Sequence, residues 1–154
     1  MLLGEALAER ASKKKQLEQI QSRAIAVARF QEGEQPAEDA GQLLDAGRRV
    51  ADELHELVRR INRTNSATEL DPGFTLTDAL AQRDGYATQF RLVTAVADAG
   101  SGERGWGRQL RSELQQVSAV PVAELRAEAD RIAAARRSLD VRIQQAGWST
   151  DLLE

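Results

Sequence analysis

Apolar residues recur every three or four positions along most of this chain, which is the spacing of one face of an α-helix. Four such stretches cover about residues 2–30, 39–61, 76–99 and 121–146. The second stretch is the most regular and keeps a heptad repeat: Leu43, Gly47, Val50, Leu54, Leu57 and Ile61. The pattern predicts a mainly α fold of four long antiparallel helices, arranged as two helical hairpins, within a single helical domain of residues 1–154.

Residues typical of helix ends separate these stretches. Gly33 is expected to stop the first helix, and Asp39 with Gln42 three residues later is typical of a capped N-terminus. Residues 31–38 are therefore predicted to connect the first two helices. Gly147 is expected to end the fourth helix.

The chain between the second and third helices has a different pattern. Asn and Thr side chains in residues 62–65 bond readily to nearby backbone groups, so the second helix is expected to end there. Residues 66–70 and 74–76 flank an Asp-Pro-Gly turn at 71–73, which predicts a small β-hairpin. Imperfect alternation in residues 110–120 favours a third strand before the fourth helix, with helical continuation as the alternative. The expected insertion is thus a β-hairpin or a three-stranded sheet.

Charge and composition narrow the function classes. The 21 basic and 24 acidic residues give a formal net charge of −3, whereas broad binding to nucleic-acid phosphates usually requires a clearly basic domain. The basic run at residues 13–15 is therefore expected on a solvated helix face, and no nucleic-acid partner is predicted. Cysteine is absent, which excludes disulfides and zinc–thiolate sites. No signal-peptide core or membrane-length apolar run is found, so a cytoplasmic location is expected.

Three patterns point toward cofactor chemistry, but each lacks its usual context. Asp52 and His55 have the spacing of ferritin-like di-iron ligands, yet the chain has no second histidine. Glycines in residues 100–105 match a dinucleotide-binding motif, but a helix precedes them and no βαβ unit surrounds them. Acidic residues in 32–39 are better explained by helix capping and solubility than by calcium. No cofactor, metal site or catalytic residue is therefore predicted, and the protein is not expected to be an enzyme.

Polar side chains are concentrated where the second helix is expected to end and the third to begin. Their simplest role is to cap both helices and to tie the β excursion to them. The alternative is a polar pocket or contact surface at one end of the bundle, able to bind a small polar ligand. The candidate residues for that ligand site are Asn62, Arg63, Thr64, Asn65, Thr68, Arg83 and Asp84.

Several segments, taken in order, carry a resemblance that covers nearly the whole chain. They are Gln31-Glu32-Gly33-Glu34 with Pro36-Ala37-Glu38-Asp39, Arg60-Ile61-Asn62-Arg63-Thr64-Asn65, Thr75-Leu76-Thr77-Asp78-Ala79-Leu80 with Arg83-Asp84, Ser112-Glu113-Leu114, Val122-Ala123-Glu124-Leu125 and the tail that begins at Trp148. On these segments the chain resembles the septicolysin-like family of small bacterial proteins. The label of that family implies a cytolysin, and the resemblance brings no established site residue with it.

Self-association is the preferred functional hypothesis. Helices of about 25 residues extend nearly 40 Å, and slender hairpins of that length have a poor ratio of volume to surface. A second copy would cover apolar stripes that one chain cannot hide, so a homo-oligomer, at least a dimer, is expected. Two alternatives stay open: a membrane-active, cytolysin-like protein, which the lack of a spanning segment does not favour, and a small-ligand or metal-binding protein.

Overall fold

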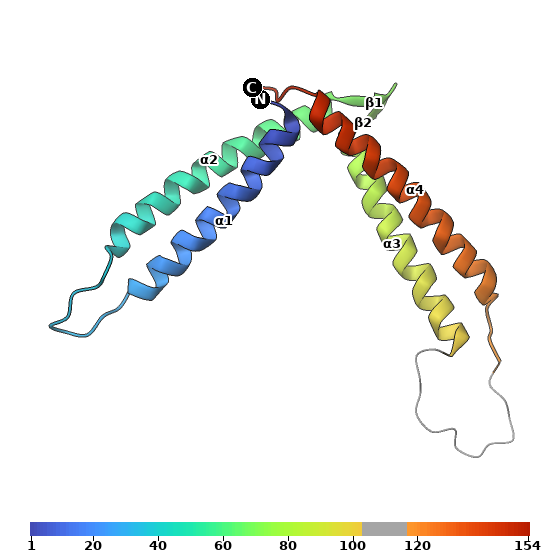
Figure 1. Cartoon of the computed structure of the whole chain (residues 1–154), viewed down its shortest axis with the longest axis horizontal. Coiled ribbons are helices and arrows are strands. Elements are labelled where there is room, and N and C mark those ends of the chain that lie inside the picture. The colour runs from blue at the N-terminus through green and yellow to red at the C-terminus, as the bar shows by residue number, and fades with distance from the viewer. Residues whose placement is uncertain (103–116) are drawn as a thin grey trace, which may run out of the picture. The chain divides into compact units, whose positions relative to one another are not determined.

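The protein is mainly helical in a computed structural model that describes residues 1–102 and 117–154. The elements of this part of the chain are α1 (Leu3–Val27), α2 (Ala40–Ala67), β1 (Glu69–Asp71), β2 (Phe74–Thr75), α3 (Leu76–Ser101) and α4 (Val122–Ser149). Figure 1 shows that α1 folds back on α2, that α3 folds back on α4, and that the short β-hairpin lies between α2 and α3. The predicted fold class is confirmed.

The chain divides into two compact units. One unit contains residues 1–75 together with 144–154, and the other contains residues 76–143. The first unit therefore holds the α1–α2 hairpin, both β-strands and the last turns of α4, whereas the second holds α3 and most of α4. The prediction of a single domain stays a prediction, and each unit is described by itself.

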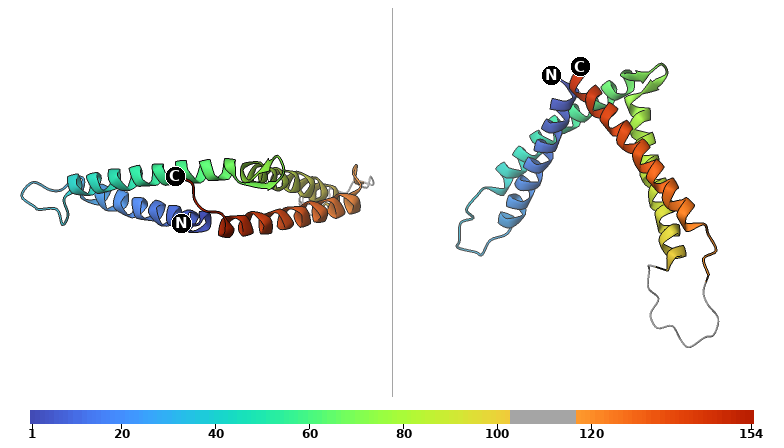
Figure 2. Two further views of the ribbon diagram at one scale, coloured as in Figure 1. Left: turned by 90° about the horizontal axis from the view of Figure 1, so that it is seen from above. Right: turned by 45° about the vertical axis from the view of Figure 1, so that its right-hand side comes forward.

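The α1–α2 hairpin packs along the apolar positions that the heptad pattern indicates. Ile20 of α1 and Leu43 and Val50 of α2 form a buried cluster, and Leu17 and Ala24 pack against it. The two helices run side by side in both views of Figure 2. A Lys13–Glu53 ion pair of 2.7 Å joins them and raises the pKa of Lys13, chiefly through the hydrogen bond to the carboxylate.

Short terminal segments close one end of this hairpin. Leu2 and Asp151 form an antiparallel β-bridge. The Leu3 N–H donates to the Thr150 carbonyl at 2.9 Å, and the Leu152 N–H donates to the Met1 carbonyl at the same distance. The markers for the two chain ends consequently lie together in Figure 1. We call this region, residues 1–6 with 60–64 and 148–154, the terminal junction.

Helix α2 continues beyond its predicted end. Residues 62–65 lie inside the helix, which ends at Ala67, so the prediction that they stop it is wrong. The Thr64 hydroxyl donates to the Arg60 carbonyl, and the Thr68 hydroxyl donates to the Thr64 carbonyl, both at 2.8 Å. These side chains bond the carbonyls of their own helix instead of turning the chain away from it, as threonines within helices can do.

The β-hairpin has the predicted position. Its strands are antiparallel, with Glu69 opposite Thr75 and Asp71 opposite Phe74. Gly73 has a φ of +74°, a conformation that favours glycine, and this explains its place in the turn. Of the third strand expected at 110–120, residues 110–116 lie outside the described residues, and 117–120 form no strand.

In the second unit, α3 and α4 run side by side and antiparallel in both figures. Ala79 and Ala97 of α3 and Ala129 and Leu139 of α4 are buried. Near the end of α3 and the start of α4, a terminal nitrogen of Arg126 lies 3.7 Å from a carboxylate oxygen of Asp98. Helix α4 runs on to Ser149 through Gly147, so the prediction that this glycine ends the helix is wrong.

Candidate functional site

The predicted polar site is distributed over both units. Its five members from residues 62–68 belong to the first unit, and Arg83 and Asp84 belong to the second. Arg83 donates to the Asp84 carboxylate with both Nε (3.1 Å) and a terminal nitrogen (2.9 Å). The Arg83 guanidinium and the Asp84 carboxylate are therefore hydrogen-bonded to one another on α3.

The α2 members of this set hold the C-terminal tail. Thr64 is fully buried, and its hydroxyl accepts a hydrogen bond of 3.0 Å from the Leu153 N–H. The Arg60 and Arg63 guanidinium groups donate to the main-chain oxygens of Leu153 (3.1 Å) and Glu154 (2.7 Å). Asn62 is exposed and Asn65 is half-buried. A structural role is thus shown for Arg63, Thr64 and Thr68, whereas ligand binding by the set stays a prediction.

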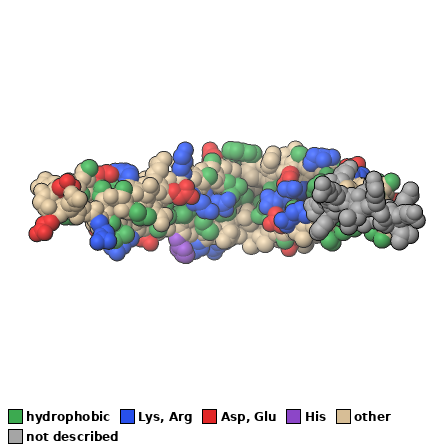
Figure 3. All heavy atoms as spheres, turned by 90° about the horizontal axis from the view of Figure 1, so that it is seen from below, with side chains coloured by type: hydrophobic (Ala, Val, Ile, Leu, Met, Phe, Trp, Pro, Cys, Tyr) green, Lys and Arg blue, Asp and Glu red, His purple; other side chains and the backbone are tan. Residues whose placement is uncertain are grey.

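The other candidate chemistry is at the surface. Asp52 and His55 are both exposed on α2, and the single histidine is visible on the face drawn in Figure 3 among basic and acidic side chains. Within residues 1–102 and 117–154, no three His, Asp or Glu side chains are grouped so that they could hold a metal ion.

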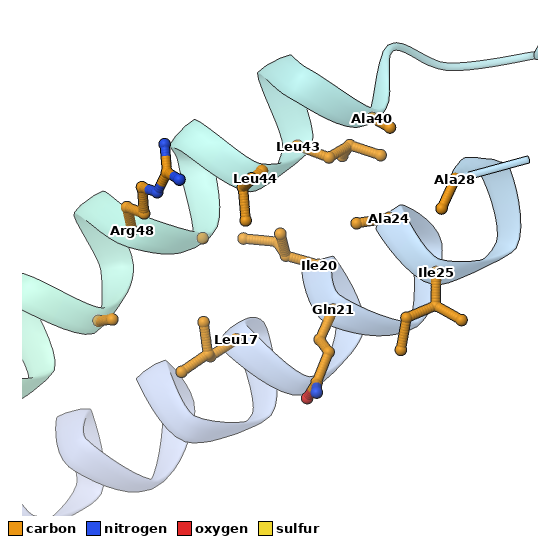
Figure 4. A pocket seen from close by; sticks show the side chains of 12 residues that line it. Leu17, Ile20, Gln21, Ala24, Ile25, Ala28, Ala40, Leu43, Leu44 and Arg48 are labelled. Atoms are coloured by element: carbon orange, nitrogen blue, oxygen red, sulfur yellow. The ribbon is translucent and has the colours of Figure 1, made fainter.

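A groove lies between α1 and α2. Its volume is about 600 Å³, and its lining is almost entirely apolar. Leu17, Ile20 and Ala24 from α1 and Leu43, Leu44 and Gly47 from α2 form most of its walls. In Figure 4, Leu17, Ile20 and Leu44 project into the space between the two helices. We call this hollow the α1–α2 groove.

Small residues keep the groove open. Ala24, Ala40, Gly47 and Ala51 line it, and none of them is long enough to fill the space between the helix axes. A Cβ atom placed on Gly47 would lie 3.4 Å from Ile20 Cγ2, which is ordinary contact. Because neighbouring atoms leave room for a side chain at Gly47, close contact does not require glycine at this position. The opening instead follows from the small side chains along both helices.

Large apolar side chains stand exposed at this groove. Ile25 is 68% exposed and Leu44 is 51% exposed, and both line the groove. Sequence reasoning missed Ile25 and Leu44 because each follows a stripe residue directly. Two pairs of consecutive apolar residues, Ala24-Ile25 and Leu43-Leu44, could have indicated this surface, because such pairs widen the apolar stripe of a helix toward a second face.

An ion pair fixes the connector at the same end of the hairpin. Arg23 of α1 donates to the Glu38 carboxylate through Nε at 3.0 Å and through a terminal nitrogen. This contact lowers the pKa of Glu38 and raises the pKa of Arg23. Next to it, the Asp39 carboxylate accepts from the Gln42 N–H at 3.0 Å and caps α2 as predicted.

Within residues 1–102 and 117–154, the protein thus consists of two helical hairpins, and the apolar α1–α2 groove is open to solvent. The chain belongs to a family of unknown function, DUF6847, whose model matches residues 10–152. It is similar to a functionally unknown conserved protein from Corynebacterium diphtheriae, with 38% identity over 99% of each chain and a TM-score of 0.92. No curated protein matches the chain.

The resemblance to septicolysin-like proteins is therefore wrong. The family match and the similar crystal structure carry no such label. Several segments behind that resemblance have general structural roles, since residues 31–39 form a connector with a helix cap and residues 60–65 form the interior of α2. Such segments recur wherever helices begin, end and continue, so they do not identify a family.

None of the helices in the described residues is long and apolar enough to cross a membrane.

Proposed function

We propose that this protein is a self-associating helical module without enzymatic activity, which acts in the cytoplasm as a homo-oligomer. The α1–α2 groove is the observation that supports the proposal. It leaves an apolar surface with Ile25 and Leu44 exposed, and no described residue covers it. Soluble monomers rarely expose large contiguous apolar patches, and such patches commonly mark interaction sites.

The free energies of burial and of association indicate how extensive the association surface must be. Burying a large aliphatic side chain completely contributes roughly 1.5–3 kcal/mol. Because Ile25 and Leu44 are already partly covered, both residues on two copies together would contribute on the order of 5 kcal/mol. The loss of free motion on association costs about 4–15 kcal/mol. A stable dimer would therefore have to cover the whole groove and gain from its charged surroundings as well.

The oligomeric state of the purified full-length chain tests this proposal. Size exclusion with light scattering at micromolar concentration is expected to give a mass of at least two chains. A stable, monodisperse monomer under these conditions would overturn the proposal.

A second candidate function is binding of an apolar small molecule in the same groove. Its volume of about 600 Å³ lies within the range of ligand pockets, about 300–1,000 Å³. A monomeric protein that binds a hydrophobic fluorescent dye with one-to-one stoichiometry, and loses that binding in Leu44→Glu, would favour this alternative over self-association.

A further inference from the structure

We infer that the α1–α2 groove is covered by the same groove of a second copy, with the two hairpins antiparallel. This inference rests on the proposed self-association and adds the surface, the partner and the direction. The occupant is identified by charge, because the two ends of the groove carry opposite charges on one molecule.

On α1, the rows of residues that line the groove continue toward the terminal junction with basic side chains. Lys14 precedes the lining residue Gln21 by seven positions, and Arg10 precedes the lining residue Leu17 by seven, so both continue rows of the groove along α1. Lys14 is exposed and Arg10 is half-buried. Within the described part of the chain, neither residue forms an ion pair.

The end nearer the connector is acidic. Residues 28–39 contain four carboxylates and a single basic residue, Arg29. Glu38 is engaged by Arg23, and Asp39 caps α2. Glu32 and Glu34 are exposed, and in residues 1–102 and 117–154 they form no ion pair. Two carboxylates are therefore available to a partner at this end.

A two-fold axis near Gln21 brings these ends together. Gln21 lies midway between Lys14 and Ala28, about 10 Å from each along the helix. Antiparallel pairing about this point sets Lys14 level with Ala28 of the second copy, where the acidic connector begins, and the same contact is repeated at the other end. Parallel pairing would instead place carboxylates against carboxylates, and like charges in contact disfavour a complex.

The absence of cysteine allows a direct test of the arrangement with single-cysteine variants and a short bismaleimide. Gln21→Cys is expected to form a covalent dimer. Lys14→Cys and Ala28→Cys are each expected to stay uncoupled alone but to couple when the two variants are mixed. The matched control is Gln89→Cys, an exposed position on α3, which is expected to stay uncoupled.

Exchanging the charges at the two ends of the groove tests the same inference without a covalent crosslink. The pair Arg10→Glu with Lys14→Glu, and separately the pair Glu32→Lys with Glu34→Lys, are each expected to weaken self-association by about tenfold or more. An equal mixture of the two variants should regain the lost affinity, because every contact in the mixed dimer is again between opposite charges. High salt should shrink all these differences, since exposed charges are screened.

The outcomes separate the two proposals. A monomeric wild-type chain overturns both. An oligomer in which Lys14→Cys couples to itself, or in which only Gln89→Cys couples, overturns the groove arrangement while self-association stands. Failure of the mixed charge variants to regain affinity, with wild-type self-association intact, also rejects the antiparallel contact. Retained helical circular dichroism in each variant shows that the changed affinity does not arise from unfolding.

Discussion

The two ends of the α1–α2 hairpin are built from the same pair of helices and yet differ in how they are covered. At the terminal junction Leu3 and Ile61 are only 2% and 1% exposed, and Thr64 is completely buried. At the connector end Ile25 and Leu44 remain more than half exposed. The difference arises from residues 150–154, which pair with the N-terminal segment and bond to α2 at one end only.

This contrast shows that a continuous apolar stripe does not determine how a hairpin is covered. The stripe on α2 runs from Leu43 to Ile61, but a short segment of the same chain closes only its last turns. Of the remaining stripe residues, Leu43 and Gly47 line the open groove, whereas Val50 and Leu57 are buried. An open face next to a closed one on the same helices is the physical reason for proposing that another molecule covers it.

The largest expected difference in unfolding free energy comes from shortening one apolar side chain at each end of the α1–α2 hairpin. Ile61→Ala leaves a cavity in a buried site and is expected to reduce the free energy of unfolding by about 2–5 kcal/mol. Leu44→Ala should cost no more than about 0.5 kcal/mol in the monomer, as is usual for surface substitutions. Urea unfolding followed by circular dichroism measures both.

The concentration dependence of this experiment adds a second result. If Leu44 lies in an interface, the loss caused by Leu44→Ala should grow with protein concentration, whereas the loss caused by Ile61→Ala should change less. Equal losses of unfolding free energy for the two variants in dilute solution would show that both ends of the hairpin are equally well packed, which would contradict the difference in exposure.

The buried hydroxyl of Thr64 is expected to give the next largest effect. Thr64→Val keeps the shape of the side chain but leaves the Leu153 N–H without its acceptor. The expected loss is about 1–3 kcal/mol in the free energy of unfolding. Thr64→Ser, which retains the hydroxyl, is the matched control and should be the milder variant. A Thr64→Val protein as stable as Thr64→Ser would contradict the role of this hydroxyl in holding the tail.

The same substitution at two glycines should have opposite signs. A Cβ atom on Gly4 would lie 2.8 Å from the Trp148 ring, but one on Gly47 would make ordinary contacts. Gly4→Ala is expected to destabilise by about 1–3 kcal/mol through crowding. Gly47→Ala should stabilise by up to about 1 kcal/mol, because alanine favours helix more than glycine does. Thermal melts of both variants measure this.

Removing the aromatic ring provides the control for this crowding. In a Trp148→Ala background, Gly4→Ala should no longer be destabilising, since the atoms that it would meet are gone. Persistence of the full cost in that background would mean that Gly4 is required for a reason other than its contact with Trp148.

The smallest expected effect is a pH dependence at the connector. Arg23 lowers the pKa of Glu38 in the folded protein, so this contact contributes stability above the unfolded-state pKa, and the contribution is lost as the pH falls through the lowered pKa. Arg23→Ala should therefore melt slightly below the wild type at about pH 7 and equal to it at about pH 2. Arg29→Ala, which removes a neighbouring charge, should not show this pH-dependent difference.

The helical fold was predictable because the information lies in local spacing. Heptad positions on α2 identify its buried face, and the Asp-Pro-Gly turn identifies the β-hairpin. Helix ends were less predictable where distant contacts decide them. Residues 62–65 contain side chains that favour turns, but the buried Thr64 bonds to the tail and the helix continues.

The candidate site was less accessible from the sequence. The α1–α2 groove depends on how small residues of two helices face one another, and a single helix pattern does not show that. The pairing of Leu2 with Asp151 involves segments of only a few residues, too short to give a periodic signal. The polar set at residues 62–84 was conspicuous in the sequence, but several of its members proved to hold the chain to itself.

The terminal junction also has a consequence for biosynthesis. Residues 1–6 are synthesised long before residues 150–154, and these segments bond to one another. The hairpin can form while translation continues, because its contacts are close in sequence. Its Leu3 and Ile61 side chains, however, are sealed from water only after residues 150–154 have been made, so the nascent polypeptide first carries both ends of the hairpin uncovered.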